Sequence, residues 1–296
     1  MSLVVVGSVG LDDIQTPLGS VQSALGGSAV YASMAARNFT TPHIIGVVGS
    51  DFPSQHIQML NSHGINLEGF QVKEGSTFRW SGKYEDLNHA ISLLTDLGVF
   101  GEFDPLIPQN CLCCRSLLLG NIHPALQLKV LQQINSYHFV GCDTMNYWIT
   151  GEKHLLAEVL KKVDIIFMNE AEVKQFTGQK DIFGAAEDLL KLGAKIIVVK
   201  RGEYGAVAIG EDFYFFAPAY PVRKVIDPTG AGDCFAGGFM GYLATQDQLC
   251  RQTVKNAVLY GTVMAAINVS AFSIKNLIGI DRELVDANYN QLLSWI

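Results

Sequence analysis

The chain of 296 residues carries 21 basic and 28 acidic side chains, and its net charge of −7 argues against a nucleic-acid-binding surface. Hydrophobic residues make up 49% of the sequence and charged residues 17%, which favours a sizeable core and argues against disorder. No stretch approaches the roughly 18 uninterrupted apolar residues of a membrane span, and the N-terminus lacks the basic start of a signal peptide. We therefore expect a cytoplasmic globular protein.

Short β-branched segments alternate with longer amphipathic ones, which predicts βα units on a mostly parallel sheet. In chain order, the expected strands are 3–7, 43–49, 116–119, 138–142, 164–168, 195–200 and 206–209. The expected helices are 28–38, 52–62, 124–134, 153–161, 182–192, 232–244, 252–268 and 282–293. Neither an internal repeat nor a linker is evident, so we expect a single α/β domain over residues 1–296.

Residues 70–97 break this alternation. Strand-like segments follow one another there, and Phe78, Trp80 and Tyr84 recur at a spacing of about two. Antiparallel strands inserted into an α/β enzyme often form a lid over its site. Lid core, a dimer face and contact with a substrate all remain open as roles for these aromatic side chains.

The sequence DPTGAGDCFAGG at residues 227–238 holds the strongest chemical signal in the chain. Gly230 and Gly232 flank Ala231 and lead directly to Asp233 at the start of an expected helix. Glycines allow several backbone N–H groups to face one point, and a helix N-terminus adds roughly half a positive charge there. A carboxylate beside such an anion site has a chemical purpose if it deprotonates a hydroxyl group during phosphoryl transfer. The plain alternative is a glycine-rich helix start that Asp233 caps.

This stretch resembles the signature of the PfkB/ribokinase family of carbohydrate kinases, D-T/P-T-G/A-A-G-D. The resemblance spans the chain, because a Gly-Gly pair, the lid, an N-x-x-E motif and the signature follow in the family's order. It implies a ribokinase-like three-layer α/β/α sandwich with a mostly parallel central sheet. It also implies a small β-sheet lid, which we place at about residues 11–23 and 70–97.

The resemblance assigns catalytic roles within the signature. Asp233 is expected to be the catalytic base, kept ionised at neutral pH by the helix N-terminus. Gly230, Ala231 and Gly232 are expected to form, with Asp233, an anion hole for the γ-phosphate. The implied reaction transfers the γ-phosphoryl group of Mg-ATP to a hydroxyl group of a sugar or nucleoside.

The resemblance also implies contacts with the nucleotide and with Mg²⁺. Asn169 and Glu172 match the N-x-x-E motif, whose oxygens organise the metal ion, partly through water. The same two residues form the pattern of a helix capping box, and the two roles are compatible. The residues expected to bind the nucleotide are Asn169, Glu172, Lys200, Gly202, Gly205, Thr229, Gly230 and Gly232.

The acceptor is expected between the sheet and the lid. Asp12 matches an early aspartate of the family that holds two substrate hydroxyl groups, and a carboxylate can accept hydrogen bonds from both. The adjacent Asp13 remains the alternative residue for this role. Gly26 and Gly27 match the family's Gly-Gly pair, which allows the backbone to approach the substrate closely.

One departure from the family bears on the identity of the acceptor. Ribokinase-like sequences often carry an asparagine after the Gly-Gly pair that binds a sugar hydroxyl, and the matching residue here is Tyr31. Together with Phe78 and Trp80, Tyr31 favours a flat aromatic acceptor, with inosine, guanosine and adenosine as candidates. Sugars and inositols remain open as acceptors.

Other classes of protein fit the sequence less well. A Walker A sequence is absent, and the Rossmann spacing G-x-G-x-x-G does not follow the first strand. A pseudokinase that binds ligands without turnover would not need the base Asp233. The expected partners are a small-molecule acceptor, ATP and Mg²⁺, without nucleic acid or membrane. A homodimer through the lid and activation by a monovalent cation stay open.

Six cysteines complete the set of reactive side chains. Three of them cluster at residues 111–114, where we expect neither a C-x-x-C pair nor a nearby histidine to complete a zinc site. We expect reduced core or loop cysteines there, with metal binding as the less favoured alternative.

Overall fold

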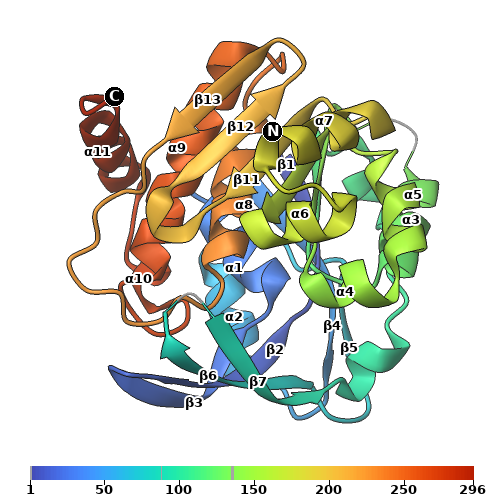
Figure 1. Cartoon of the computed structure of the whole chain (residues 1–296). Helices are drawn as coiled ribbons and strands as arrows, with labels where there is room; N and C mark the ends of the chain where they lie inside the picture. Colours follow the sequence, from blue (N-terminus) through green and yellow to red (C-terminus); the bar gives the residue numbers. More distant parts are fainter. Residues whose placement is uncertain (1, 88, 135–136) are drawn as a thin grey trace.

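The computed structural model describes residues 2–87, 89–134 and 137–296 (Figure 1). A nine-stranded sheet forms its centre, and all neighbouring strands run parallel except at the β11–β12–β13 edge. In order across the sheet the strands are β13 (Phe213–Ala217), β12 (Ala206–Gly210), β11 (Ile196–Lys200), β10 (Ile165–Asn169), β9 (Phe139–Asp143), β8 (Ser116–Leu119), β1 (Ser2–Val6), β4 (Thr41–Gly49) and β5 (Phe70–Lys73).

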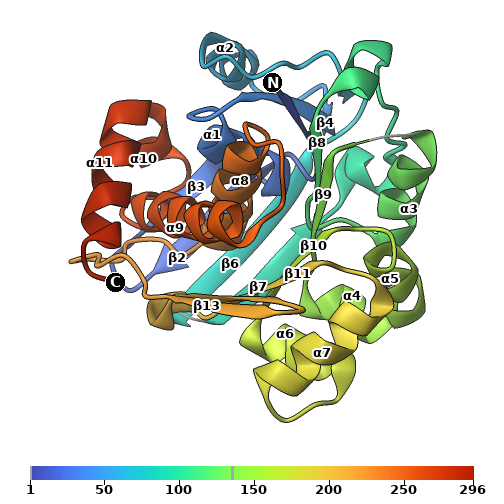
Figure 2. The same cartoon turned by 90° about the horizontal axis from the view of Figure 1, so that it is seen from above.

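Helices cover both faces of this sheet, so the expected three-layer α/β/α sandwich is confirmed (Figure 2). One face carries α1 (Ser28–Ala36), α2 (Ser54–Ser62), α8 (Ala231–Leu243), α9 (Arg251–Asn268), α10 (Lys275–Ile278) and α11 (Arg282–Leu293). The other face carries α3 (Pro124–Gln133), α4 (Asn146–Gly151), α5 (Lys153–Leu160), α6 (Glu170–Thr177) and α7 (Ile182–Leu192). Each face has its own apolar core, because the sheet strands bury side chains on both sides. Among the described residues, no helix is long and apolar enough to cross a membrane.

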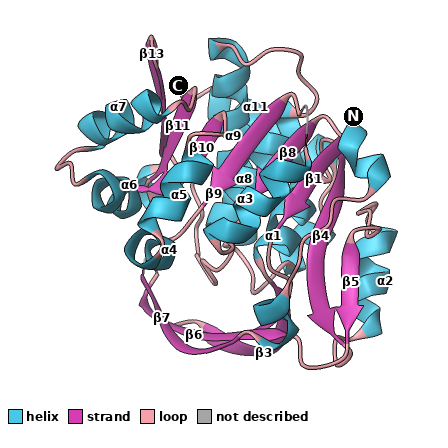
Figure 3. Cartoon of the chain, turned by 90° about the vertical axis from the view of Figure 1, so that its right-hand side faces the viewer, coloured by secondary structure: helices cyan, strands magenta, loops and turns pink. Residues whose placement is uncertain are grey.

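A second, four-stranded sheet lies across one end of the large sheet (Figure 3). Its strands, in order, are β3 (Gly19–Gly26), β2 (Gly10–Thr16), β6 (Phe78–Asp86) and β7 (His89–Asp96), and only the β2–β6 pair is parallel. We call this sheet the lid. The structure differs from the sequence expectation at β5, which lies within the range 70–97 but pairs with β4 in the large sheet.

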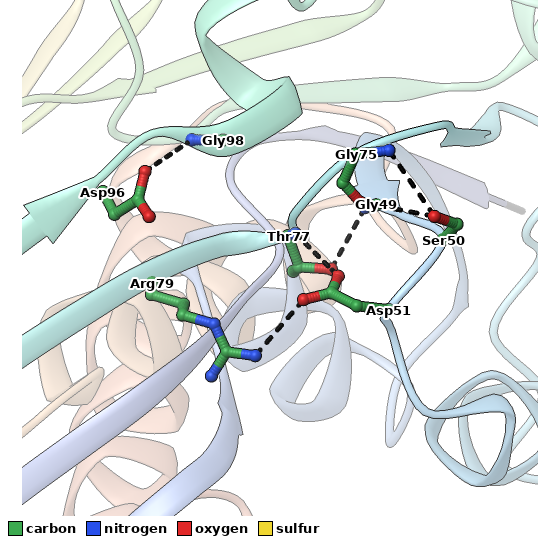
Figure 4. Close-up of polar contacts among 8 residues, drawn as sticks. All are labelled: Gly49, Ser50, Asp51, Gly75, Thr77, Arg79, Asp96 and Gly98. Atoms are coloured by element: carbon green, nitrogen blue, oxygen red, sulfur yellow. Dashed lines mark hydrogen bonds and ion pairs between the residues drawn. The ribbon is translucent and has the colours of Figure 1, made fainter.

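A polar network anchors the lid to the large sheet where β6 begins (Figure 4). Asp51, just after β4, accepts hydrogen bonds through Oδ1 from the Thr77 amide at 2.7 Å and the Thr77 hydroxyl at 2.6 Å. Its Oδ2 pairs with Arg79 of β6 at 3.2 Å. The Gly49 amide donates to the Thr77 hydroxyl oxygen at 3.0 Å, so the end of β4 and the start of β6 are held together.

Helices α1 and α8 approach each other closely because α8 carries glycines where they meet. A Cβ atom on Gly237 would lie 2.1 Å from the carbonyl oxygen of Ala32, and one on Gly241 would lie 2.9 Å from Cα of Ala36. Every residue of α1 is buried. The contact brings the N-terminus of α8, and with it the 227–238 signature, against the start of α1.

We expect Gly237→Ala to lower the free energy of unfolding by about 1–3 kcal/mol, the range for overpacking a well-packed core. The new methyl group would overlap the backbone of α1, which outweighs the better helix propensity of alanine. Urea unfolding measures the effect. Gly279→Ala is the matched control, because a Cβ there meets nothing within 4 Å. Equal stability of Gly237→Ala and the wild type would contradict the close contact.

Candidate active site

The carboxyl ends of three neighbouring parallel strands bring polar side chains together beneath the lid. Asp143 ends β9, Asn169 ends β10 and Lys200 ends β11, and the strand register places Asn169 directly beside Lys200. Open α/β sheets bind their ligands at this edge.

A buried ion pair joins two of these strand ends. Lys200 Nζ lies 2.7 Å and 2.9 Å from the carboxylate oxygens of Asp143, with side chains only 17% and 5% exposed. Burial alone would lower the pKa of Lys200, but the charges of Asp143 and Glu172 raise it. Sequence reasoning missed Asp143, although its place directly after an expected strand was a signal.

The signature begins α8 with a turn that only glycine tolerates. Gly230 has φ of 74°, and a Cβ atom there would lie 2.4 Å from the ring of Tyr31. Tyr31 is 1% exposed, and among the described residues no group forms a hydrogen bond with its hydroxyl. The structure thus places Tyr31 beneath the signature turn, as a support for Gly230.

The first turn of α8 presents free amides toward the strand ends. The Ala231 amide donates to the Pro228 carbonyl at 3.1 Å. The amides of Gly232 and Asp233 follow within the first helical turn, where no helical carbonyl is available to accept. A Cβ on Gly232 would lie 3.0 Å from Lys200 Nζ, so a cation lies beside these amides. This arrangement suits an anion.

Asp233 differs electrostatically from the sequence expectation. Burial raises the pKa of its carboxyl group to about 7, and the charge of Asp143 adds to this effect while Lys200 opposes it. The helix N-terminus therefore does not hold Asp233 fully ionised at neutral pH. A carboxyl group that titrates near neutrality is well matched to proton transfer at physiological pH.

The predicted capping box at the start of α6 is confirmed. Asn169 Oδ1 accepts a hydrogen bond from the Glu172 amide at 2.9 Å, and Glu172 Oε2 accepts one from the Asn169 amide at 2.7 Å. Burial raises the pKa of Glu172 to about 7, while Lys200 opposes the shift. Each side-chain oxygen keeps further lone pairs for another partner.

The predicted turn after β11 has the left-handed backbone conformation that glycine favours. Gly202 and Gly205 have φ of 54° and 84°, and a Cβ on Gly205 would lie 2.0 Å from the Ala217 carbonyl oxygen. Just before this turn, the Arg201 side chain pairs with Glu170 of α6 at 2.9 Å. The turn therefore holds its place beside β13 and α6.

On the lid side of the site, Asp12 projects from β2 against the Gly-Gly pair. A Cβ on Gly26 would lie 1.9 Å from Asp12 Oδ2, and Gly27 has φ of 99°, so neither position tolerates a side chain. Asp12 is 4% exposed. Its pKa is raised to about 7. Burial is the largest cause, and the negative charges of Asp227 and Asp233 contribute to the same rise. Asp12 and the signature acids thus lie within electrostatic reach of one another.

The two lid aromatics of the sequence prediction are half-buried and engaged within the lid region. The Phe78 ring lies 5.5 Å from that of Phe100. The Trp80 indole N–H donates to the Ser92 hydroxyl of β7 at 3.0 Å. Contact of either ring with an acceptor stays a prediction.

A third lid aromatic, Tyr84, contacts the signature directly. Its hydroxyl oxygen accepts a hydrogen bond from the Thr229 hydroxyl at 3.1 Å. Burial raises the pKa of Tyr84 to about 12, although the bond to Thr229 opposes this. Asp227 orders the same turn, because it accepts hydrogen bonds from the amides of Thr229 at 2.9 Å and Ser273 at 3.1 Å. The spacing of lid aromatics was the signal for Tyr84, but it did not show which one reaches the signature.

Comparison with known proteins identifies the family. The pfkB family carbohydrate kinase model matches residues 2–278. The chain belongs to the pfkB family of carbohydrate kinases. Members of this family are phosphotransferases that act on hydroxyl groups, so the chain is an enzyme of that class.

Named relatives within the pfkB family include nucleoside kinases. A cytidine kinase of Thermococcus kodakarensis is 32% identical over 250 residues, which cover 82% of this chain and 88% of that protein. A nucleoside kinase of Methanocaldococcus jannaschii is 25% identical over 231 residues, covering 77% of this chain and 74% of that protein. The chain is thus a sugar or nucleoside kinase of the ribokinase family.

Solved structures share the whole fold with this pfkB-family chain. The crystal structure of the M. jannaschii nucleoside kinase superimposes with a TM-score of 0.80 at 21% identity and covers 98% of both chains. Arabidopsis thaliana ribokinase, complexed with ribose and ATP, gives a TM-score of 0.78 at 20% identity and covers 97% of this chain and 98% of its own. At these identities the likeness establishes the fold.

We expect Asp12→Asn to raise the free energy of unfolding at about pH 8. The pKa of Asp12 rises from 3.8 to about 7 on folding, so its favourable contribution is complete below about pH 4 and is lost as the pH rises through about 7. Each unit of pKa shift corresponds to about 1.4 kcal/mol, so the gain is on the order of a few kcal/mol.

Urea unfolding at about pH 5 and about pH 8 measures this gain. Asp13→Asn is the matched control, because Asp13 is the exposed neighbour of Asp12 on the same strand. The same pH dependence in Asp12→Asn as in the wild type would show that Asp12 is not a buried, shifted carboxyl group.

Proposed function

We propose that this enzyme is a nucleoside kinase, with residues 1–296 acting as one kinase domain, and that it transfers the γ-phosphoryl group of Mg-ATP to a nucleoside hydroxyl. One observation carries the proposal. The carboxyl group of Asp12 on the lid and that of Asp233 at the start of α8 lie close enough for the charge of Asp233 to raise the pKa of Asp12. One acid is suited to holding an acceptor and the other to receiving its proton.

The acceptor is held from the lid side. Asp12 can accept hydrogen bonds from the two vicinal hydroxyl groups of a ribose, and Gly26 keeps the space around its carboxylate free of side chains. Phe78 and Trp80 offer flat apolar surfaces for a base. The names of the cytidine and nucleoside kinase relatives support a nucleoside over a free sugar or an inositol.

The donor is proposed to bind along the strand ends of β9, β10 and β11. Carboxylate and amide oxygens of Asn169, Glu172 and the newly identified Asp143 fit the hard oxygen donors that Mg²⁺ prefers. When bound, Mg²⁺ would neutralise charge on the β- and γ-phosphates. Lys200 and the amide of Gly232 are proposed to face the phosphates at these strand ends. Gly202, Gly205 and Thr229 are also assigned to binding the nucleotide, as the sequence predicts.

Asp233 is proposed to accept the acceptor's hydroxyl proton as the phosphoryl group is transferred. The amides of Gly232 and Asp233 would stabilise the charge on the transferring group without reorganisation, because the helix already fixes them. The Tyr84–Thr229 hydrogen bond holds the lid against the signature. A closed lid keeps water away from the transferring phosphoryl group and suppresses ATP hydrolysis.

We expect Asp233→Asn to lower the rate by at least about 10²-fold with little change in nucleotide affinity, since the variant keeps the shape but loses the base. In the wild type, kcat/KM should rise as the pH increases through about 7, because only the ionised carboxylate accepts the proton. ADP release with Mg-ATP measures both. Glu211→Gln, in the exposed turn between β12 and β13, is the control. Near-normal turnover of Asp233→Asn would remove Asp233 from this role.

The acceptor is identified with the same assay across cytidine, inosine, guanosine, adenosine, ribose, fructose and inositol. Turnover confined to nucleosides and lost in Asp233→Asn would support the proposal. Turnover confined to free sugars or inositol would overturn the nucleoside assignment but retain the kinase chemistry. If folded protein that binds ATP releases no ADP with any acceptor, the result would favour the pseudokinase alternative.

We also propose that the lid mediates a homodimer. β7 is an edge strand of the lid and exposes Ile91, Leu93 and Leu94, which are 46%, 61% and 55% exposed. An apolar edge strand with unpaired backbone groups favours pairing with another chain. Leu93→Glu should convert a dimer to a monomer in sedimentation experiments. Leu106→Glu is the matched control, because Leu106 is 60% exposed outside the lid. A monomeric wild type would refute this proposal.

A further inference from the structure

A histidine and two cysteines lie close together at the end of the large sheet that is opposite the lid. Cys111 belongs to the short 3-10 helix η2 (Gln109–Cys113), Cys114 follows it, and His43 lies near the amino end of β4. Both cysteines are buried and His43 is half-buried. Their ligand atoms all lie within 4.8 Å of one another.

The expectation of reduced cysteines is confirmed, because Cys111 and Cys114 are both free. The expectation that no C-x-x-C pair lies here was wrong. Cys111 and Cys114 have the C-x-x-C spacing, and the histidine that the local sequence lacks is supplied from 68 residues earlier in the chain. Sequence proximity could not reveal it, because β4 and η2 are brought together only when β4 and β8 pack on either side of β1.

The contact between Cys111 and His43 has the length expected across a tetrahedral metal centre. Cys111 Sγ lies 3.5 Å from His43 Nδ1. Metal–sulfur and metal–nitrogen bonds of about 2.3 Å and 2.05 Å at a tetrahedral angle place these atoms roughly 3.6 Å apart. Two cysteine sulfurs and an imidazole nitrogen form a ligand set that favours zinc over Mg²⁺ or Ca²⁺.

A contact from outside the cluster helps to hold η2 in position. The Tyr137 hydroxyl donates to the Cys111 carbonyl at 2.9 Å. Cys113, the third cysteine of the turn, is exposed, and its thiol donates to the Asn110 carbonyl at 2.9 Å. Cys113 therefore already has a partner within the turn and is not one of the three ligands.

We propose that His43, Cys111 and Cys114 bind a structural zinc ion. Binding forms two zinc–thiolate bonds and one zinc–imidazole bond and releases the two thiol protons to solvent. The ion would fasten η2 to the start of β4. His43 and the end of β4 at Gly49 are separated by roughly 20 Å of extended strand, so the ion serves folding stability and not phosphoryl transfer.

The experiment uses the full chain purified with a reductant under nitrogen. We expect close to one zinc ion per chain by elemental analysis. Replacement by Co²⁺ should give the thiolate-to-cobalt charge-transfer band and the intense visible bands of a tetrahedral centre. The chelator TPEN, which removes zinc but spares Mg²⁺, should lower the melting temperature and leave kinase turnover at low temperature unchanged.

Matched variants locate the ligands. Cys111→Ser, Cys114→Ser and His43→Asn should each lose zinc and the cobalt spectrum, whereas Cys113→Ser should keep both. The cobalt spectrum is recorded on the wild type, so it tests the site even if a variant fails to fold. A reduced wild type that binds neither metal, or loss of zinc in Cys113→Ser alone, would overturn the proposal.

Discussion

The ion pair between Lys200 and Asp143 is the interaction on which the candidate site depends. Five acids, Asp12, Asp143, Glu172, Asp227 and Asp233, are gathered at the ends of the strands and under the lid, and burial raises the pKa of four of them. Lys200 is the cation that opposes this rise at Glu172 and Asp233. Bringing so many acids together is unfavourable, and a cluster of acids with perturbed pKa values is typical of a functional site.

Close backbone approaches give this site its shape. At Gly26, Gly230 and Gly232, an added Cβ would meet Asp12, Tyr31 and Lys200. In each case a glycine in the chain allows a functional or supporting side chain to lie against the backbone. Gly237 and Gly241 of α8 act in the same way in the core, where they allow α8 to pack closely against α1. The amides proposed to bind an anion are therefore placed by packing as well as by the helix itself.

Several hydrogen bonds tie the lid to the body, and two groups of them lie at separated points. Asp51 and Thr77 join it to the end of β4, while Tyr84 and Thr229 join it to the signature. The first contact lies where the chain enters β6 and involves an ionised side chain. The second is a single hydrogen bond between two hydroxyl groups, which is weaker and easier to break. The contact with the signature is therefore the weaker of these two.

The sequence by itself determined the alternation of strands and helices, the signature at the start of α8 and the capping box at Asn169, because each rests on local periodicity or on residues within one turn. It also pointed to a lid. Tertiary structure alone decided the partners that lie far apart in the chain: Lys200 with Asp143 across 57 residues, Tyr84 with Thr229 across 145, and His43 with Cys111 across 68. It also placed β5 in the large sheet, put Tyr31 under Gly230 and brought the pKa of Asp233 to about 7. Burial and long-range contact arise only when the layers close, so no local pattern could report them.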